Sequence, residues 1–126
     1  MMTHARTAYM DASVATASPA RLLVMLCERL VLDVTRGRDA LVAGDREESN
    51  RQLVHAQEII LELRASLKVE ECDAGPGLAS IYDYLHTQLV RANITRDVAM
   101  AEGCLSLVSD LCATWREAAL LSLSAA

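Results

Sequence analysis

Residues 98–119 read VAMAEGCLSLVSDLCATWREAA, and apolar residues recur in this stretch every three or four positions. That spacing gathers them on one face of an α-helix, because each helical residue turns by about 100°. No stretch of the chain alternates with the period of two that is typical of a strand. We therefore predict a long amphipathic helix whose core face carries Val98, Ala101, Leu105, Val108, Cys112, Trp115 and Ala119.

The same spacing occurs in three earlier segments, which turn and capping signals separate. Their predicted core faces carry Leu23, Cys27, Leu30, Val34 and Leu41, then Leu53, Ala56, Ile60, Leu63 and Leu67, then Leu78, Ile81, Leu85, Leu89 and Ala92. Ser18-Pro19 predicts a helix start, because a serine hydroxyl accepts a free backbone N–H and proline suits the first helical turn. Gly44-Asp45 predicts the end of that helix, and Thr95 is expected to cap the last one after a break at Asn93-Ile94-Thr95. The helices are expected at about residues 19–43, 46–68, 78–92 and 95–121, with a loop at 72–77. Short connections predict an all-α fold, an antiparallel four-helix bundle over residues 18–126 after a mobile N-terminal arm at 1–17.

Composition narrows the class of protein. The chain has 126 residues, the size of one domain, and 52% of them are hydrophobic, which excludes a disordered class. The net charge of −5 makes a nucleic-acid partner unexpected, since phosphate backbones would be repelled. The longest apolar run, Leu22 to Cys27, is too short for membrane insertion, and no signal peptide is visible. Four cysteines without a CxxC motif indicate reduced thiols in the cytoplasm.

Several apolar residues fall outside the four core faces. In the run from Leu22 to Cys27 they cannot all point at one core, because successive helical side chains point in different directions. The last helix carries a complete second row, rotated by about a quarter-turn from the first. A thick core, a homodimer face, the arm folded back, or a groove for an amphipathic partner segment would each explain such a surplus. The off-face residues are Val24, Met25, Val31, Leu32, Val54, Leu61, Tyr84, Val90, Met100, Cys104, Leu107, Leu111 and Ala118.

Motifs that carry catalysis or bind cofactors are missing from the sequence. Neither GxGxxG nor GxxxxGK[ST] occurs, so no phosphate-binding loop is expected. Asp83-x-x-His86 resembles half of a di-iron motif, but the remaining ligands are absent, and a polar surface pair is the expected explanation. We therefore predict no enzyme activity, no cofactor and no metal. The alternative function is a histidine phosphotransfer module, with His55 or His86 as the modified residue.

Six motifs in order, from about residue 8 to 118, resemble the flagellin-export chaperones of the FliS type. Each is weak by itself, and their common register makes the resemblance specific. One departure stands at Cys27, where the family usually has an aromatic residue. The motifs are Ala8-Tyr9, Val14-Ala15-Thr16-Ala17-Ser18-Pro19 with Leu22-Leu23-Val24-Met25-Leu26, His55-Ala56-Gln57-Glu58-Ile59-Ile60-Leu61-Glu62-Leu63, Ile81-Tyr82-Asp83-Tyr84-Leu85, Leu89-Val90-Arg91-Ala92-Asn93 and Thr114-Trp115.

The resemblance implies a cytoplasmic chaperone that binds the disordered C-terminal segment of flagellin in apolar grooves. It implies that binding prevents premature polymerisation and delivers flagellin to the export gate protein, with other flagellar regulatory or co-chaperone proteins as further partners. It also implies that the arm, through Tyr9, covers part of the groove when no partner is bound. We therefore expect partner binding at Tyr9, Val24, Met25, Val31, Leu32, Val54, Leu61, Tyr84, Met100, Cys104, Leu107 and Leu111.

Overall fold

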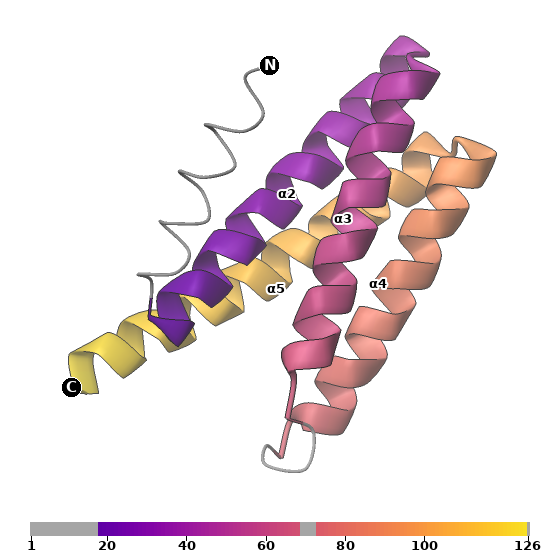
Figure 1. Ribbon diagram of the computed structural model, residues 1–126. Helices are drawn as coiled ribbons and strands as arrows, with labels where there is room; N and C mark the ends of the chain where they lie inside the picture. The colour runs from indigo at the N-terminus through magenta and orange to yellow at the C-terminus, as the bar shows by residue number, and fades with distance from the viewer. Residues whose placement is uncertain (1–17, 69–72, 126) are drawn as a thin grey trace.

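The computed structural model describes residues 18–68 and 73–125, and within these ranges the chain forms four helices and no strand (Figure 1). The helices run up, down, up and down, so that neighbours along the chain are antiparallel. The all-α antiparallel bundle is therefore confirmed, while the expected arm at 1–17 lies outside the described residues. The helices are α2 (Pro19–Ala43), α3 (Arg46–Ser66), α4 (Gly75–Thr95) and α5 (Val98–Ala125).

The first two boundaries follow the capping signals of the sequence. The Ser18 hydroxyl accepts the backbone N–H of Arg21 at 3.2 Å, which caps α2. Gly44 ends α2 in a left-handed conformation, with φ of 73°, which glycine adopts without steric cost. The carboxylate of Asp45 then accepts the backbone N–H of Glu48 at 3.1 Å and starts α3. The predicted turn between these helices is confirmed.

The connection between α4 and α5 differs from the expectation. Thr95 is not the cap of α5, because its hydroxyl donates back to the carbonyl of Arg91 at 2.7 Å within α4. Asp97 caps α5 instead, accepting the backbone N–H of Met100 at 3.0 Å. Asn93 does not break α4, which continues to Thr95, and its side chain donates to Asn50 on α3 at 2.9 Å.

The ends of the long loop also differ from the expectation. α3 stops at Ser66, two residues before the expected Lys68, and α4 starts at Gly75, three residues before Leu78. Pro76 stands in the first turn of α4, where its missing N–H has no intrahelical partner to lose.

The core contains the centre of each face that the helical spacing predicts, and it also takes in Ile59 on α3, Tyr82 on α4, and Cys104 and Leu111 on α5. Each helix contributes fully buried side chains, for example Leu30 of α2, Leu53 of α3, Leu89 of α4 and Val108 of α5. On α4, Tyr82 is buried to 1% exposure, although the predicted face contained its neighbour Ile81, which is only partly buried. The tyrosine can enter the core because its hydroxyl accepts the indole N–H of Trp115 at 3.0 Å.

The four helices do not pack equally along their lengths. α2 packs against both α3 and α5, and α4 packs against α3 and α5. Figure 1 shows that the last turns of α5 lie beside the start of α2, away from the loop end of α3 and α4. The α2–α5 pair and the α3–α4 pair therefore diverge at one end of the bundle.

A buried carboxylate joins α2 to α3, and the sequence analysis did not single it out. Asp33 is 0% exposed, and its Oδ1 accepts the Nε–H of Arg29 at 2.9 Å. Its Oδ2 contacts Nδ1 of His55 on α3. Burial of a carboxylate is costly unless it is paired and hydrogen-bonded, and both oxygens of Asp33 have partners here.

We expect opposite stability effects from alanine at two helical glycines. A Cβ on Gly37 would stand 2.6 Å from Cδ2 of Leu53, and that leucine is held in the core. Overpacking costs roughly 1–3 kcal/mol and exceeds the gain of about 1 kcal/mol in helix propensity. Gly37→Ala should therefore lower the free energy of unfolding in urea. At Gly103 a Cβ would meet nothing within 4 Å, so Gly103→Ala should raise that free energy by about 0.5–1 kcal/mol. Equal effects at both positions would contradict the close helix contact at Gly37.

Candidate functional site

A groove between α4 and α5 brings four of the expected partner-binding residues together. It encloses about 470 Å³ and contains Tyr84 from α4 with Met100, Cys104 and Leu107 from α5. Gln88, Asp97, Ala99 and Gly103 complete its lining. The off-face apolar residues of two helices thus form one surface, as a docking groove requires.

The walls of this groove are apolar, and its edge is polar. Tyr84 is 56% exposed, and its hydroxyl accepts the side-chain N–H of Gln88 at 3.3 Å. Burial raises the pKa of the Cys104 thiol to about 11, so the thiol stays neutral near pH 7. Leu107 is partly buried and rests on the core. Such a surface suits apolar side chains of a partner and offers no activated nucleophile at Cys104.

Two residues of the expected second row on α5 belong to the interior. Cys104 is 3% exposed and Leu111 is 7% exposed, and both are part of the main core cluster. Of the explanations offered for the surplus, a thick core therefore applies to Cys104 and Leu111, and their expected role in partner binding stays a prediction. The reason is that α5 packs against both α2 and α4, which widens its buried arc beyond one stripe. Leu107 and Met100 remain partly accessible.

A second apolar cavity lies where the two helix pairs diverge. It encloses about 350 Å³, and Leu23, Leu63, Tyr82 and Trp115 contribute to it from α2, α3, α4 and α5 in turn. Ser66 at the end of α3 and Leu67 and Lys68 beyond it complete the lining. The sequence analysis assigned Leu23, Leu67 and Trp115 to core faces. No sequence signal marks this cavity, because the divergence of the helices is a tertiary feature.

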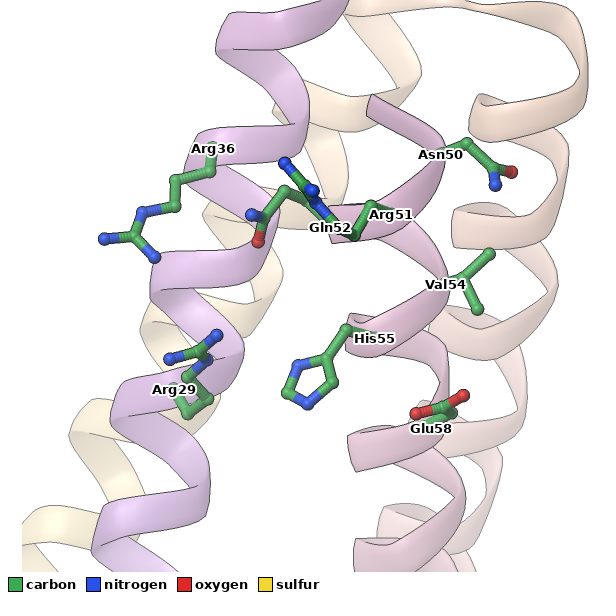
Figure 2. A pocket seen from close by; sticks show the side chains of 8 residues that line it. All are labelled: Arg29, Arg36, Asn50, Arg51, Gln52, Val54, His55 and Glu58. Atoms are coloured by element: carbon green, nitrogen blue, oxygen red, sulfur yellow. The ribbon is translucent and has the colours of Figure 1, made fainter. Parts of the chain in front are cut away.

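The remaining expected residues lie on α2 and α3, away from the α4–α5 groove. Val54 lines a wide cleft over α2 and α3 together with three arginines, and its side chain lies on the side of α3 away from α2 (Figure 2). Leu32 and Leu61 are 38% and 51% exposed on the same two helices. Val24, Met25 and Val31 are partly buried on α2, and Val31 packs against the core. The expected binding residues are therefore divided between two faces, and Tyr9 lies outside the described residues.

The polar groups considered for chemistry have structural partners. The Asp83 carboxylate accepts the Nε–H of Arg64 on α3 at 3.2 Å, so its ion-pair partner is Arg64 and not the expected His86. Nδ1 of His55 is engaged by Asp33. Within the described ranges, no three His, Cys, Asp or Glu side chains cluster as metal ligands would. In the same ranges, none of the helices combines the length and hydropathy that a membrane-spanning helix needs.

Comparisons with known proteins agree with this arrangement. The sequence pattern of the family described as flagellar protein FliS matches residues 1–121. The flagellar secretion chaperone FliS of Bacillus subtilis (strain 168) is 33% identical over 112 residues, which cover 89% of this chain and 84% of the relative. The protein of the same name from Salmonella typhimurium (strain LT2) is 29% identical, over 85% of this chain and 81% of the relative.

A solved structure shares the fold. A bacterial flagellar chaperone known from a crystal structure superposes with a TM-score of 0.71 at 21% identity, covering 94% of this chain and 97% of the other. The match to the family pattern over nearly the whole sequence and the identity to the relatives named above establish the family of this chain. This chain belongs to the FliS family of flagellar secretion chaperones, a family of chaperones and not of enzymes.

Proposed function

We propose that this protein binds the disordered C-terminal segment of flagellin in the cytoplasm. Binding keeps the segment from polymerising until the complex reaches the flagellar export gate protein. The observation that carries the proposal is the α4–α5 groove, in which Tyr84, Met100 and Leu107 present apolar surface above the core. Membership of the FliS family of flagellar secretion chaperones supports the proposal, because such a chaperone needs a surface for a flagellar partner.

We infer that one partner segment uses both apolar cavities. Leu107 and Trp115 stand eight positions apart on α5, which is about 12 Å along a helix. Trp115 is bonded to Tyr82 of α4, and Leu107 lines the α4–α5 groove, so both lie on the side of α5 that faces α4. Ordering a disordered segment costs a few kcal/mol, and several apolar anchors offset that cost better than one.

The other hypotheses from the sequence have less support. A histidine phosphotransfer module would be unexpected in a family of chaperones. A homodimer would use the same apolar groove as flagellin, so dimerisation and flagellin binding would compete. The covering role of Tyr9 and the binding of other flagellar regulatory or co-chaperone proteins stay predictions.

We expect Leu107→Asp to weaken flagellin binding without unfolding the bundle. The aspartate would face the docked apolar anchor without a partner, and affinity should fall by about 2–3 kcal/mol. Calorimetric titration with a peptide of the flagellin C-terminus measures the loss. Val108→Asp is the matched control, since Val108 is fully buried and the charge should cost stability by about 4 kcal/mol or more. If Leu107→Asp unfolds as readily as Val108→Asp, or binds the peptide normally, the groove assignment is wrong.

The single tryptophan gives an independent test of the second cavity. Trp115 lines that cavity and is only partly buried. A flagellin segment docked there would displace water from the indole, so the emission maximum should move to shorter wavelength as a tryptophan-free flagellin peptide is added. The shift should follow the calorimetric binding curve. Saturation of binding with an unchanged emission spectrum would exclude this cavity from the flagellin site.

A further inference from the structure

Two cysteine side chains meet in the core between α2 and α5. Cys27 is 1% exposed and Cys112 is 2% exposed, and both belong to the main core cluster. The Cys112 thiol donates to the backbone carbonyl of Cys27 at 3.3 Å, and the two side chains are also in hydrogen-bonding contact. A side chain of α5 reaches the backbone of α2 only where the two helices approach closely. The fold therefore brings together two sulfur atoms from positions 85 apart in the sequence.

The contact makes the two thiols chemically unequal. The hydrogen bond from Cys112 lowers the pKa of Cys27 against the opposing effect of burial, and the positive charge of Arg116 lowers it further. The same hydrogen bond, together with burial, raises the pKa of Cys112. The thiolate is the form of cysteine that reacts with an oxidant, and a neighbouring thiol can then resolve the oxidised product. Cys27 is thus suited to attack first and Cys112 to resolve.

A cavity gives small molecules a route toward this pair. Leu23, one helical turn before Cys27, and Trp115, one turn after Cys112, line the cavity where the helix pairs diverge. Tyr82 belongs to the same lining; burial raises its pKa, and the nearby Cys27 and Cys112 raise it further. The pair therefore lies close beneath the cavity, and a local opening of this end of the bundle is enough to admit a molecule as small as hydrogen peroxide.

The other cysteines are placed differently. Cys104 stands more than two turns before Cys112 on α5 and lines the α4–α5 groove. Burial raises the pKa of the Cys104 thiol to about 11, so this thiol stays neutral. Cys72 lies outside the described residues. Among the three cysteines that the structure describes, Cys27 and Cys112 are the two in contact.

We propose that Cys27 and Cys112 form a reversible disulfide that links α2 to α5 when a hydroperoxide oxidises the chain. With hydrogen peroxide, the Cys27 thiolate attacks one oxygen, the O–O bond breaks, and Cys27 becomes a sulfenic acid while the other oxygen leaves as water after taking up the thiol proton. The Cys112 sulfur then attacks the sulfenic sulfur, and its proton leaves with the hydroxyl group as a second water molecule. Two thiols and one peroxide thus give one disulfide and two water molecules. Two molecules of a small thiol reverse the reaction and are themselves oxidised to a disulfide.

The disulfide would act on the helix against which both α3 and α5 pack. A bridge between positions 85 apart strongly restricts the unfolded chain, so the oxidised protein should resist unfolding better than the reduced one. The free thiols of the structure are the resting form, in agreement with the reduced cysteines expected from the sequence. Flagellin takes no part in the reaction, so disulfide formation is independent of the proposed function.

The test treats the full folded chain with an equimolar amount of hydrogen peroxide. The remaining thiols are alkylated in urea, and the chain is cleaved after arginine and before aspartate. These cuts leave Cys27 in residues 22–29 and Cys112 in residues 110–116, apart from Cys104. Mass spectrometry should find the two peptides joined, with two hydrogen atoms fewer than their sum, and dithiothreitol should separate them.

The stability of the oxidised chain gives a second readout. Peroxide should raise the urea midpoint of unfolding by at least about 1 M, and dithiothreitol should abolish the rise. Dithiothreitol does not reverse methionine oxidation, so the reversal isolates the disulfide. In Cys27→Ala and in Cys112→Ala, peroxide should cause no rise relative to the untreated variant. Cys104→Ala is the matched control, because it removes another buried thiol of α5 and should show the same rise as the wild-type chain.

Several results would overturn the proposal. They are alkylation of all four thiols after peroxide treatment, a disulfide that involves Cys72 or Cys104, a disulfide that joins two chains, or a link between Cys27 and Cys112 that forms only in urea. A disulfide that leaves the urea midpoint unchanged would contradict it as well. The peptide map needs no variant, so it decides the question even if one of the alanine variants fails to fold. Loss of flagellin binding with the disulfide still formed would refute the proposed function alone.

Discussion

The bundle depends on the double burial of α2, which packs against α3 on one side and α5 on the other. Leu30 and Val34 are fully buried, and Cys27 is 1% exposed. The Cys112 thiol donates to the Cys27 carbonyl at 3.3 Å, which ties α5 to the start of α2. Gly37 lets α3 approach so closely that a methyl group would meet Leu53. α3 and α5 pack against two different faces of α2. The last helix therefore lies against the first one and completes the bundle.

The same constraint creates the surfaces available to partners. α5 follows α2 to its start, so it leaves the loop end of α3 and α4, and the apolar cavity around Trp115 opens there. At the other end, the short Arg96-Asp97 connection keeps α4 and α5 together, with Arg96 in a left-handed conformation at φ of 55°. The α4–α5 groove with Met100 and Leu107 lies beside this connection. Helix arrangement, more than the residues of any one helix, therefore sets the shape of the apolar surface.

Charged side chains gather on one surface of this molecule. Arg29, Arg36, Arg51 and Glu58 from α2 and α3 line a wide cleft, whereas Asp97 is the charged residue in the lining of the α4–α5 groove. The cavity around Trp115 is lined mainly by Leu23, Leu63, Leu67 and Tyr82. The two sides of the bundle therefore differ in the chemistry they offer to a partner, since apolar burial and charge complementarity contribute differently to binding.

The sequence by itself determined the local structure of this protein. Ser18, Gly44 and Asp45 act through neighbouring backbone groups, so their roles could be predicted from their positions. The core faces followed from the period of the helix, and six motifs in register sufficed for the family. Local signals gave the wrong cap where two capping residues lie close together, because both Thr95 and Asp97 can cap α5. The Thr95 hydroxyl bonds to the carbonyl of Arg91 within α4, and Asp97 caps α5.

Tertiary structure alone decided which surplus apolar residues stayed accessible. Leu107 and Leu111 follow the same spacing, yet Leu111 is interior and Leu107 borders a groove, because α2 and α4 together cover a wide arc of α5. Nothing in the sequence around Asp33 indicates that it is buried. Its contact with His55 exists because α3 packs against α2. The arginines of the α2–α3 cleft are also far apart in sequence. Periodicity reports the face of one helix, whereas burial and clefts depend on the angles between helices, which are set by contacts between residues distant in the chain.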